Sequence, residues 1–367
     1  MKTITQLKGL MKYIGSFLII FTLLSCVKSE QTKEQRVYQL SEETTYNDIL
    51  KLIGEEKLLR GAEKPNADGS LGRNKKGYFH ARFQINMTSI SDYAVTSQNL
   101  EALEFFFSTV KYSFNHQLSD GGFELAIPSD LLQSSAFSPP HAGDLASGTA
   151  FFASSLGLSL RSLQQSNWFT QSVETQPIRK AIYELNPSIE KTLDYLISSK
   201  DYLLQMDEKA PNRLLFDALA YYTLGKYLSR KDAVSLAVEF MDKALAQTDS
   251  ELGYFIYVGV GDSSYNGVAV KLALELYFLV DEIAIKNKLK EHIIPAMNWQ
   301  MSRINENGKI STSGNKRVYD GGESFLGREK KVDYSKSIKA LYYYGHLTGS
   351  KEVVSLGDKV LTFSQRH

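Results

Sequence analysis

An internal repeat constrains the fold of this sequence more than any other feature. Residues 218–237 and 340–357 both begin with Ala-Leu and tyrosines, pass through a short polar turn, and enter a second apolar-patterned stretch. Apolar residues recur in both segments at three- and four-residue spacing, which is typical of helices. A short connection makes consecutive helices antiparallel neighbours. Each copy therefore predicts a helical hairpin, and the repetition predicts an array of such hairpins.

A second repeated element marks the other end of the hairpins. It is a polar turn with a glycine, followed by an apolar residue, and it is centred on Gly69, Gly121, Gly253 and Gly308. The gap between Gly121 and Gly253 has room for two units, and a helix over 189–204 fills the missing place. A period of roughly 50 to 65 residues indicates hairpins arranged side by side.

Helical periodicity covers most of the chain after residue 47. The expected helices are Leu100–Phe114, Gly148–Leu163, Ile189–Leu204, Leu214–Leu228, Ala233–Ala246, Val268–Val280, Ile283–Met301, Lys336–Leu347 and Glu352–Phe363. Strand-like segments such as 254–258 are few and short. A globular chain with so little strand is expected to be all-α.

Two architectures accommodate hairpins of this length. An open α-solenoid of the tetratricopeptide kind has a shorter period, about 34 residues, and tighter loops. The longer unit here, with its Gly turn and short β-like stretch, resembles the α/α-toroids of bacterial polysaccharide lyases, glycoside hydrolases and terpenoid-cyclase-like proteins. That resemblance implies inner helices around a central cavity and outer helices packed on them. We expect residues 46–367 to form one α/α-toroid domain of about five to six hairpins.

The N-terminal region has the layout of a secretory signal. Lysines precede an apolar stretch over 13–24, and the only cysteine of the chain, Cys26, follows it. Leu-Leu-Ser-Cys at 23–26 resembles the lipobox of bacterial lipoproteins, which implies removal of residues 1–25 and lipidation of Cys26. An ordinary signal peptide or an uncleaved anchor is the alternative, although the apolar run is shorter than the roughly 20 residues that span a bilayer. We expect a polar tether over 26–45 and a protein attached to the bilayer of the bacterial cell envelope.

Composition excludes several classes of function. The 42 basic and 41 acidic residues nearly cancel, and neither sign forms a long block, which argues against nucleic acid as a partner. Without a cysteine after Cys26, the mature chain has no intramolecular disulfide and no cysteine-ligated metal. The sequence motifs of zinc proteases, P-loop proteins and serine hydrolases are missing. We expect neither a cofactor nor a metal.

Candidate site residues lie in the loops that enter the expected inner helices, because such loops build the cavity floor of a toroid. Four loops precede the helices that begin near residues 148, 214, 268 and 336. If they face the same way, they surround one mouth with polar and titratable side chains: His141, Asp144, Asn212, Arg213, Tyr265, Asn266, Asp320, Glu323, Asp333 and Tyr334.

A purely structural role is an alternative for several of these residues. Asp and Asn before a helix are favoured caps, which accounts for Asp144, Asn212, Asn266 and Asp333 without any function. A histidine in a Pro-rich loop, such as His141, is as readily a buried structural residue as a catalytic one. Arg213 can simply pair with Asp217, four residues further along the same helix face.

Three functional hypotheses follow. The first is a lyase that cleaves uronic-acid glycans by β-elimination, in which Tyr or His exchanges the protons and Asn, Arg or His neutralises the carboxylate. It assigns catalysis to His141, Tyr265 and Tyr334, and substrate binding to Asn212, Arg213, Asn266, Asp144, Asp320, Glu323 and Asp333. Arg213 is the expected carboxylate anchor because its planar fork binds both oxygens. A glycoside hydrolase would instead use two of the acids, about 5 to 10 Å apart. The remaining hypothesis is a non-catalytic lipoprotein that binds a glycan or a protein.

Overall fold

Helices dominate the computed structural model, which describes residues 39–133 and 140–366. The described strands are two short antiparallel hairpins, β1 (Ile256–Tyr257) with β2 (Val260–Gly261), and β3 (Ser324–Phe325) with β4 (Arg328–Glu329). Ile256 pairs with Gly261 in the first, and Ser324 with Glu329 in the second. The all-α prediction is therefore confirmed. Cys26 and the lipobox lie outside the described residues.

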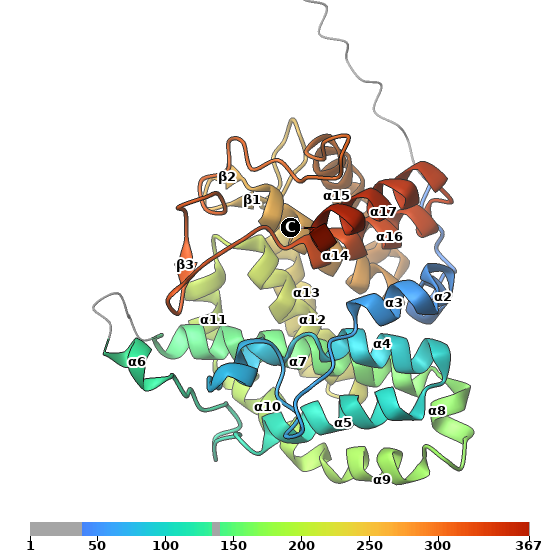
Figure 1. Ribbon diagram of the computed structural model, residues 1–367, viewed down its shortest axis with the longest axis vertical. Helices are drawn as coiled ribbons and strands as arrows, with labels where there is room; N and C mark the ends of the chain where they lie inside the picture. Colours follow the sequence, from blue (N-terminus) through green and yellow to red (C-terminus); the bar gives the residue numbers. More distant parts are fainter. Residues whose placement is uncertain (1–38, 134–139, 367) are drawn as a thin grey trace, which may run out of the picture. The chain divides into compact units, whose positions relative to one another are not determined.

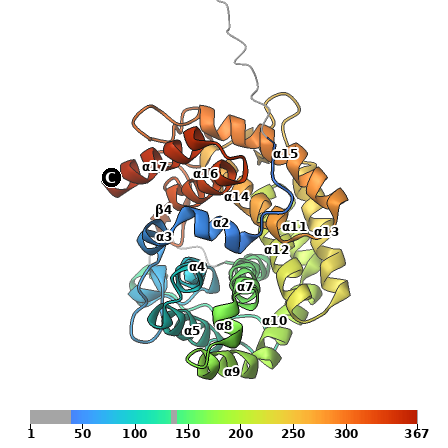
Figure 2. The ribbon, with the colours of Figure 1, turned by 90° about the vertical axis from the view of Figure 1, so that its right-hand side faces the viewer.

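Five inner helices form a series in which each contacts the next. They are α4 (Met87–Ser97), α7 (Ala142–Gln164), α12 (Pro211–Tyr227), α14 (Ser263–Leu279) and α16 (Tyr334–Leu347). The helix α2 (Tyr46–Ile53) contacts α16, α14 and α4, so it joins the two ends of the series (Figure 2). The result is a closed ring, which excludes the open solenoid and confirms the predicted α/α-toroid.

Outer helices cover the ring, one hairpin after another (Figure 2). They are α5 (Leu100–Phe114) on α4, α10 (Asn186–Ser198) and α11 (Lys200–Asp207) on α7, α13 (Lys231–Leu245) on α12, α15 (Ile283–Ser302) on α14, and α17 (Lys351–Arg366) on α16. The short helices α3 (Glu55–Gly61), α6 (Ser129–Leu132), α8 (Asn167–Gln171) and α9 (Gln176–Glu184) complete the fold. The inner helices α7, α12 and α14 are buried along most of their length, whereas α17 buries one stripe.

The four repeated Gly turns connect neighbouring hairpins. All four glycines have a positive φ, between 73° and 95°, which L side chains rarely adopt. A Cβ atom added at any of them would also lie only 2.1 or 2.2 Å from the outer helix of the next hairpin. The contacts are Gly69 with Ser108 of α5, Gly121 with Lys191 of α10, Gly253 with Pro295 of α15 and Gly308 with Lys359 of α17. Glycine is required there for conformation and for close packing.

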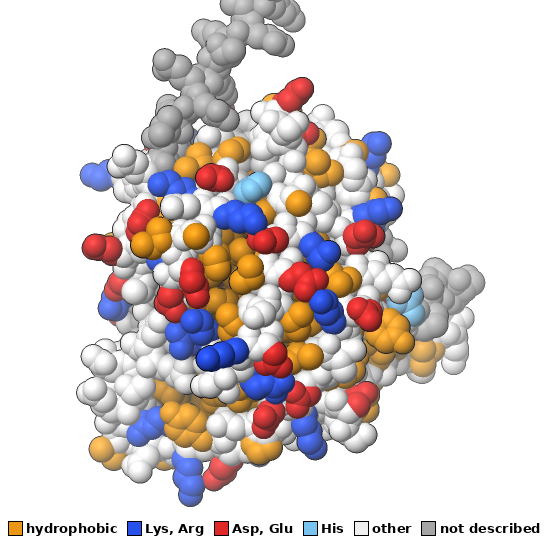
Figure 3. Space-filling view, turned by 180° about the vertical axis from the view of Figure 1, so that it is seen from behind, with side chains coloured by type: hydrophobic (Ala, Val, Ile, Leu, Met, Phe, Trp, Pro, Cys, Tyr) orange, Lys and Arg blue, Asp and Glu red, His pale blue; other side chains and the backbone are white. Residues whose placement is uncertain are grey.

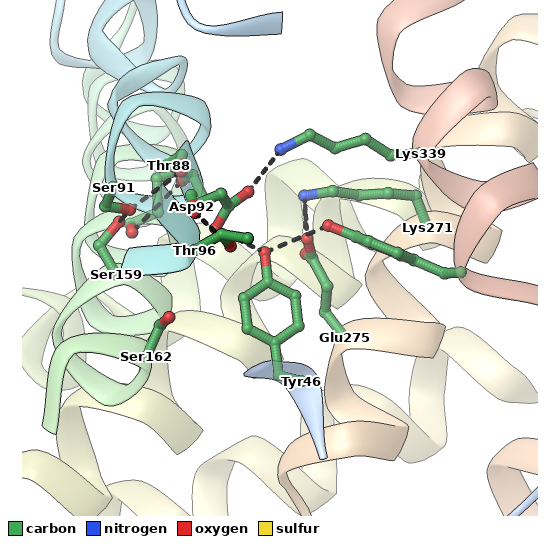
Figure 4. A network of polar contacts seen from close by, with 12 residues as sticks. Tyr46, Thr88, Ser91, Asp92, Thr96, Ser159, Ser162, Lys271, Glu275 and Lys339 are labelled. Carbon is green, nitrogen blue, oxygen red and sulfur yellow. Dashed lines mark hydrogen bonds and ion pairs between the residues drawn. The ribbon is translucent and has the colours of Figure 1, made fainter. Parts of the chain in front are cut away.

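A buried set of charged and phenolic side chains closes the ring, and we call it the closing network (Figure 4). Lys339 of α16 pairs with Asp92 of α4 at 2.9 Å, and the Tyr46 hydroxyl of α2 donates to the other Asp92 oxygen at 2.9 Å. The hydroxyls of Tyr46 and Tyr343 lie 3.1 Å apart, and the pair Lys271–Glu275 of α14 completes the set at 2.6 Å. Each cation of this network therefore has a carboxylate partner.

The outer surface has no dominant charge on the face that Figure 3 shows, where basic and acidic side chains are interspersed. None of the described helices is both long and apolar enough to cross a membrane.

Candidate functional site

A cavity of about 380 Å³ opens at the end of the ring where the inner helices begin, and we call it the entry pocket. Figure 1 shows β1, β2, β3 and α6 at this end of the molecule. Its volume is within the usual range of small-molecule sites. Cations outnumber acids in its wall: Arg73, Arg82, Arg328, Lys330, Lys331 and Lys336 against Glu329 and Asp333. Aromatic rings also line the cavity: Phe83, Phe151, Phe216, Tyr265 and Phe325.

Arg82 is the most unusual of these cations. Its guanidinium lies 4.7 Å from the ring centre of Phe151 and 4.4 Å from that of Phe325. Among the residues that the structure describes, no carboxylate comes within ion-pairing distance of it. Burial, followed by the charge of Arg213, lowers the pKa of Arg82 to about 10. A partly desolvated cation without a counter-ion is costly for the fold, and a bound anion would remove that cost.

A close approach between two segments places Arg82 in the pocket. Arg82 belongs to the 3₁₀ helix η2 (Ala81–Gln84), which packs on α7. The His80 ring lies so close to Gly148 of α7 that a Cβ atom there would be 2.2 Å from it. His80 Nδ1 accepts a hydrogen bond from the Arg82 backbone N–H at 3.3 Å. Burial lowers the pKa of His80 to about 3, so the ring is neutral and adds no charge beside Arg82.

The hairpin β3–β4 forms one wall of the pocket, and Arg73 fixes it. Arg73, in the 3₁₀ helix η1 (Gly72–Lys76), donates to the backbone oxygen of Phe325 at 2.7 Å and to that of Leu326. These bonds hold the Phe325 ring over the Arg82 guanidinium. Both arginines come from the loop that precedes α4, so this loop supplies two of the six cations in the pocket wall.

Tyr265, Glu323 and Lys330 form a hydrogen-bonded triad at the pocket wall. The Tyr265 hydroxyl donates to Glu323 at 2.9 Å, and the Lys330 ammonium donates to that hydroxyl at 2.8 Å and to Glu323 at 2.7 Å. The Tyr265 ring stacks on Tyr257 with ring centres 3.9 Å apart. The triad therefore couples an acid, a phenol and an amine at the edge of the cavity.

Electrostatics assigns each member of the triad a protonation state. Burial and the charge of Arg82 lower the pKa of Lys330 to about 8. Burial opposes ionisation of Glu323, but hydrogen bonds from Arg317 and Lys330 outweigh it and lower the Glu323 pKa to about 2. Burial, Tyr257 and Glu323 raise the pKa of Tyr265, so this phenol keeps its proton at neutral pH. Lys330 is thus the member that titrates closest to neutrality.

Three of the four predicted loops meet at the entry pocket. Asn212, Tyr265 and Asp333 line it, and Glu323 lies directly behind Tyr265. Asp333 also caps α16, because its carboxylate accepts from the Lys336 N–H at 3.1 Å. The Oδ1 atom of Asn212 is buried and has no hydrogen-bond partner among the described residues.

Arg213, Asp144 and His141 lie together beside the pocket. Arg213 pairs with Asp207 at 3.0 Å and lies 3.7 Å from Asp144. The ion pair that the spacing suggested with Asp217 is not formed, because Asp207 from the end of α11 takes its place. Burial opposes the charge of Arg213, but Asp207 raises its pKa. His141 lies 3.6 Å from Asp144, and its side chain is 63% exposed.

The remaining predicted residues do not line the entry pocket. Asn266 is fully buried, where it accepts from the Phe255 N–H at 3.0 Å and donates to Ala296 and Gln300 of α15. Tyr334 packs on Phe363 and lines a neighbouring cavity. Asp320 is fully exposed and pairs with Lys331 at 3.6 Å.

Sequence reasoning missed Arg73, Arg82, Lys330 and Lys336. The two arginines were overlooked because α4 was not among the expected helices, so its entry loop was not considered. A signal was present, since the Gly69 turn implies an inner helix between that turn and Leu100. The two lysines lie in or next to the last predicted loop, where only acids and tyrosines were selected.

Comparisons with known proteins add little to this picture. No protein-family model matches the chain, and no curated protein matches it. Among solved structures, the chain is similar to cellobiose 2-epimerase from Spirochaeta thermophila, with 14% identity and a TM-score of 0.42 over 80% of this chain and 78% of that one. Within the described residues, no group of three or more His, Cys, Asp or Glu could hold a metal ion.

Proposed function

We propose that this protein is a lipid-anchored lyase of the bacterial cell envelope that binds an acidic glycan in the entry pocket and cleaves it by β-elimination. The observation that carries the proposal is Arg82, an aromatic-flanked cation with no carboxylate partner among the described residues. A uronic-acid carboxylate supplies the missing negative charge. The planar guanidinium fork can bind both of its oxygens.

The walls of the pocket suit the rest of a sugar ring. Phe151 and Phe325 exclude water around Arg82, which strengthens its attraction for a carboxylate. Lys336 adds a second cation that has no carboxylate within ion-pairing distance among the described residues. Together these groups favour an acidic sugar over a neutral one.

The triad supplies the two proton transfers of an elimination. Arg82 neutralises the carboxylate, which stabilises the negative charge that develops when the C5 proton leaves. Lys330 in its neutral form takes that proton, the C4–O bond breaks, and a C4–C5 double bond forms. The Tyr265 phenol donates a proton to the departing glycosidic oxygen. The hydrogen bond between Lys330 and Tyr265 then allows the proton on the amine to restore the phenol.

Hydrolysis is less well supported, because the carboxylates at the pocket are already engaged. Glu329 accepts from the Gly321 N–H and pairs with Lys331, while Asp333 caps α16. Glu323 has a pKa of about 2 and cannot hold the proton that a general acid must donate. A non-catalytic glycan-binding lipoprotein is the second candidate, since unpaired cations serve binding as well as catalysis.

The test is an activity assay on the full chain with a panel of uronic-acid polymers and matched neutral polymers, following the ultraviolet absorbance of the unsaturated product. We expect turnover of at least one acidic polymer and a kcat/KM that rises with pH toward about 8, the pKa of Lys330. Arg82→Met and Lys330→Met are expected to lower kcat/KM by at least about 100-fold. Lys180→Met, which changes an exposed lysine of α9 outside the entry pocket, is the control and should have little effect.

The assay separates the lyase from the binding protein and tests the roles assigned to Arg82 and Lys330. Binding of acidic polymers without turnover would replace the lyase with the binding protein. Equal use of neutral polymers, or activity that survives both Arg82→Met and Lys330→Met, would refute the assignment of roles.

The lipid anchor is tested separately. Leu-Leu-Ser-Cys at 23–26 motivates a comparison of the parent chain with Cys26→Ala in bacterial cell fractions. We expect the parent in the membrane fraction with lipid on Cys26, and the variant without that lipid. A variant as firmly membrane-bound as the parent, with no lipid mass on either N-terminal peptide, would contradict the anchor.

A further inference from the structure

A second cavity, of about 340 Å³, lies beside the entry pocket. It is formed by residues of α2, α3, α4, α16 and α17, where the last hairpin of the ring meets the first, so we call it the seam pocket. The residues that matter for its chemistry are Lys57, Arg60, Tyr334, Lys336, Lys339 and Tyr342.

Lys336 lines both cavities. The residue is 9% exposed, and no carboxylate of the described chain lies within ion-pairing distance of its ammonium group. The two cavities are therefore neighbours that share one unpaired, largely buried cation. A ligand that extends from the entry pocket toward Lys336 reaches the seam pocket next.

Four cations line the seam pocket, and no acidic residue of the described chain does. Lys57, Arg60 and Lys339 line it, whereas their acidic partners, Asp358, Glu56 and Asp92, do not. Each of these three cations is therefore ion-paired, and Lys336 is the cation of this wall without a carboxylate partner among the described residues. This arrangement leaves the cavity itself complementary to a negative ligand.

Aromatic and apolar surface completes the wall. The Tyr334 ring packs on Phe363 with ring centres 5.6 Å apart, and Lys57 lies 4.5 Å from the ring centre of Tyr342. Ile53, Leu58 and Leu361 supply further apolar area. A sugar ring has the same combination of features, an apolar face and polar edges, and a uronic acid adds the negative charge.

We propose that the seam pocket is a second subsite for the acidic glycan, so that the protein binds at least two neighbouring acidic sugars with Lys336 between them. This inference rests on the proposed function of the entry pocket. It deepens that function by assigning a place to the neighbouring acidic sugar, because a single sugar would occupy only one of the two cavities.

The test measures the affinity of the full chain for a length series of one uronic-acid oligomer, from monosaccharide to tetrasaccharide, by titration calorimetry. We expect affinity to rise by at least about tenfold between the monosaccharide and the tetrasaccharide, which is about 1.4 kcal/mol. Arg60→Gln, which changes only the seam pocket, should remove most of that gain and leave the monosaccharide affinity unchanged. Lys336→Met should weaken binding of both lengths, and the exposed Lys51→Gln is the control.

The outcomes separate the two proposals. If no oligomer of any length binds, the proposed function of the entry pocket fails. If the monosaccharide binds and the tetrasaccharide binds no better, the entry pocket stands and the second subsite is overturned. A length gain that persists in Arg60→Gln and Lys336→Met also overturns it.

Discussion

The closing network and the entry pocket both place lysines, arginines and acids inside the same ring of helices, but they differ in how the charges are paired. In the closing network, Lys339 pairs with Asp92 at 2.9 Å and Lys271 with Glu275 at 2.6 Å. In the entry pocket, Arg82 and Lys336 have no such partner among the described residues. Paired cations thus hold helices together in the closing network, whereas the unpaired Arg82 and Lys336 can bind a negatively charged ligand in the entry pocket.

The comparison has an energetic consequence. Removing one partner of a buried ion pair leaves the other charge uncompensated, which is strongly destabilising. Removing a cation that has no partner relieves a desolvation cost instead. Loss of Asp92 and loss of Arg82 should therefore affect stability differently, and loss of Arg82 should also weaken binding of an acidic ligand.

The largest expected effect is in the closing network. Asp92→Asn leaves the Lys339 ammonium without a carboxylate in the ring interior, so the free energy of unfolding should fall by about 3 to 5 kcal/mol. Urea denaturation of the full chain measures it, with the exposed Asp201→Asn as the control. A loss below about 1 kcal/mol would show that the pair contributes no more than a surface salt bridge.

The opposite behaviour is expected at the entry pocket. Arg82→Met should leave the free energy of unfolding within about 1 kcal/mol of the parent or raise it, because no ion pair is broken. The same variant should lose at least about tenfold in affinity for an acidic oligosaccharide. Denaturation and calorimetry on one preparation give both values. Destabilisation as large as that of Asp92→Asn would remove the distinction between the two regions.

A smaller effect concerns the pH dependence of stability. The pKa of Glu323 is about 2 in the folded chain and 4.5 for a glutamate without these interactions, as in the unfolded chain. The unfolded state therefore binds more protons than the folded state between these two pH values. The contribution of Glu323 is therefore fully present above pH 4.5 and is lost as the pH falls toward 2. We expect it to be about 2 kcal/mol, reduced from the full linkage value because the side chain is partly solvated.

Urea denaturation between pH 2 and 6 checks this slope. Glu323→Gln should be less stable than the parent above pH 4.5 and should flatten the pH dependence below it. The exposed Glu104→Gln is the control. An unchanged slope in Glu323→Gln would mean that Arg317 and Lys330 do not stabilise this carboxylate.

The two regions also differ in how far they could be predicted from sequence. The toroid was predictable because its signals are local: apolar spacing within each helix, and a glycine wherever a turn packs on the next outer helix. The helix α4 was missed because half of its buried side chains are polar. Ser91 bonds to Ser159 of α7 at 2.8 Å, and Asp92 pairs with Lys339 of α16, so polar residues interrupt the apolar pattern of its core face.

The candidate site was only partly predictable for a related reason. Loop position alone was enough to bring Asn212, Tyr265 and Asp333 to one cavity. Side-chain direction was not available from spacing, so Asn266 was expected in the pocket although it bonds to α15. The partner of Arg213 was likewise set by packing, because Asp207 arrives from α11, a separate helix.

The central claim is that Arg82 is a cation kept unpaired for an acidic ligand. The most direct measurement is calorimetric binding of an acidic oligosaccharide and a neutral one of equal length, at low and high salt, to the parent and to Arg82→Met. We predict that the parent prefers the acidic sugar by at least about tenfold, that salt weakens this preference, and that Arg82→Met abolishes it. Equal affinity of the parent for both sugars, or a preference that Arg82→Met retains, would contradict the account.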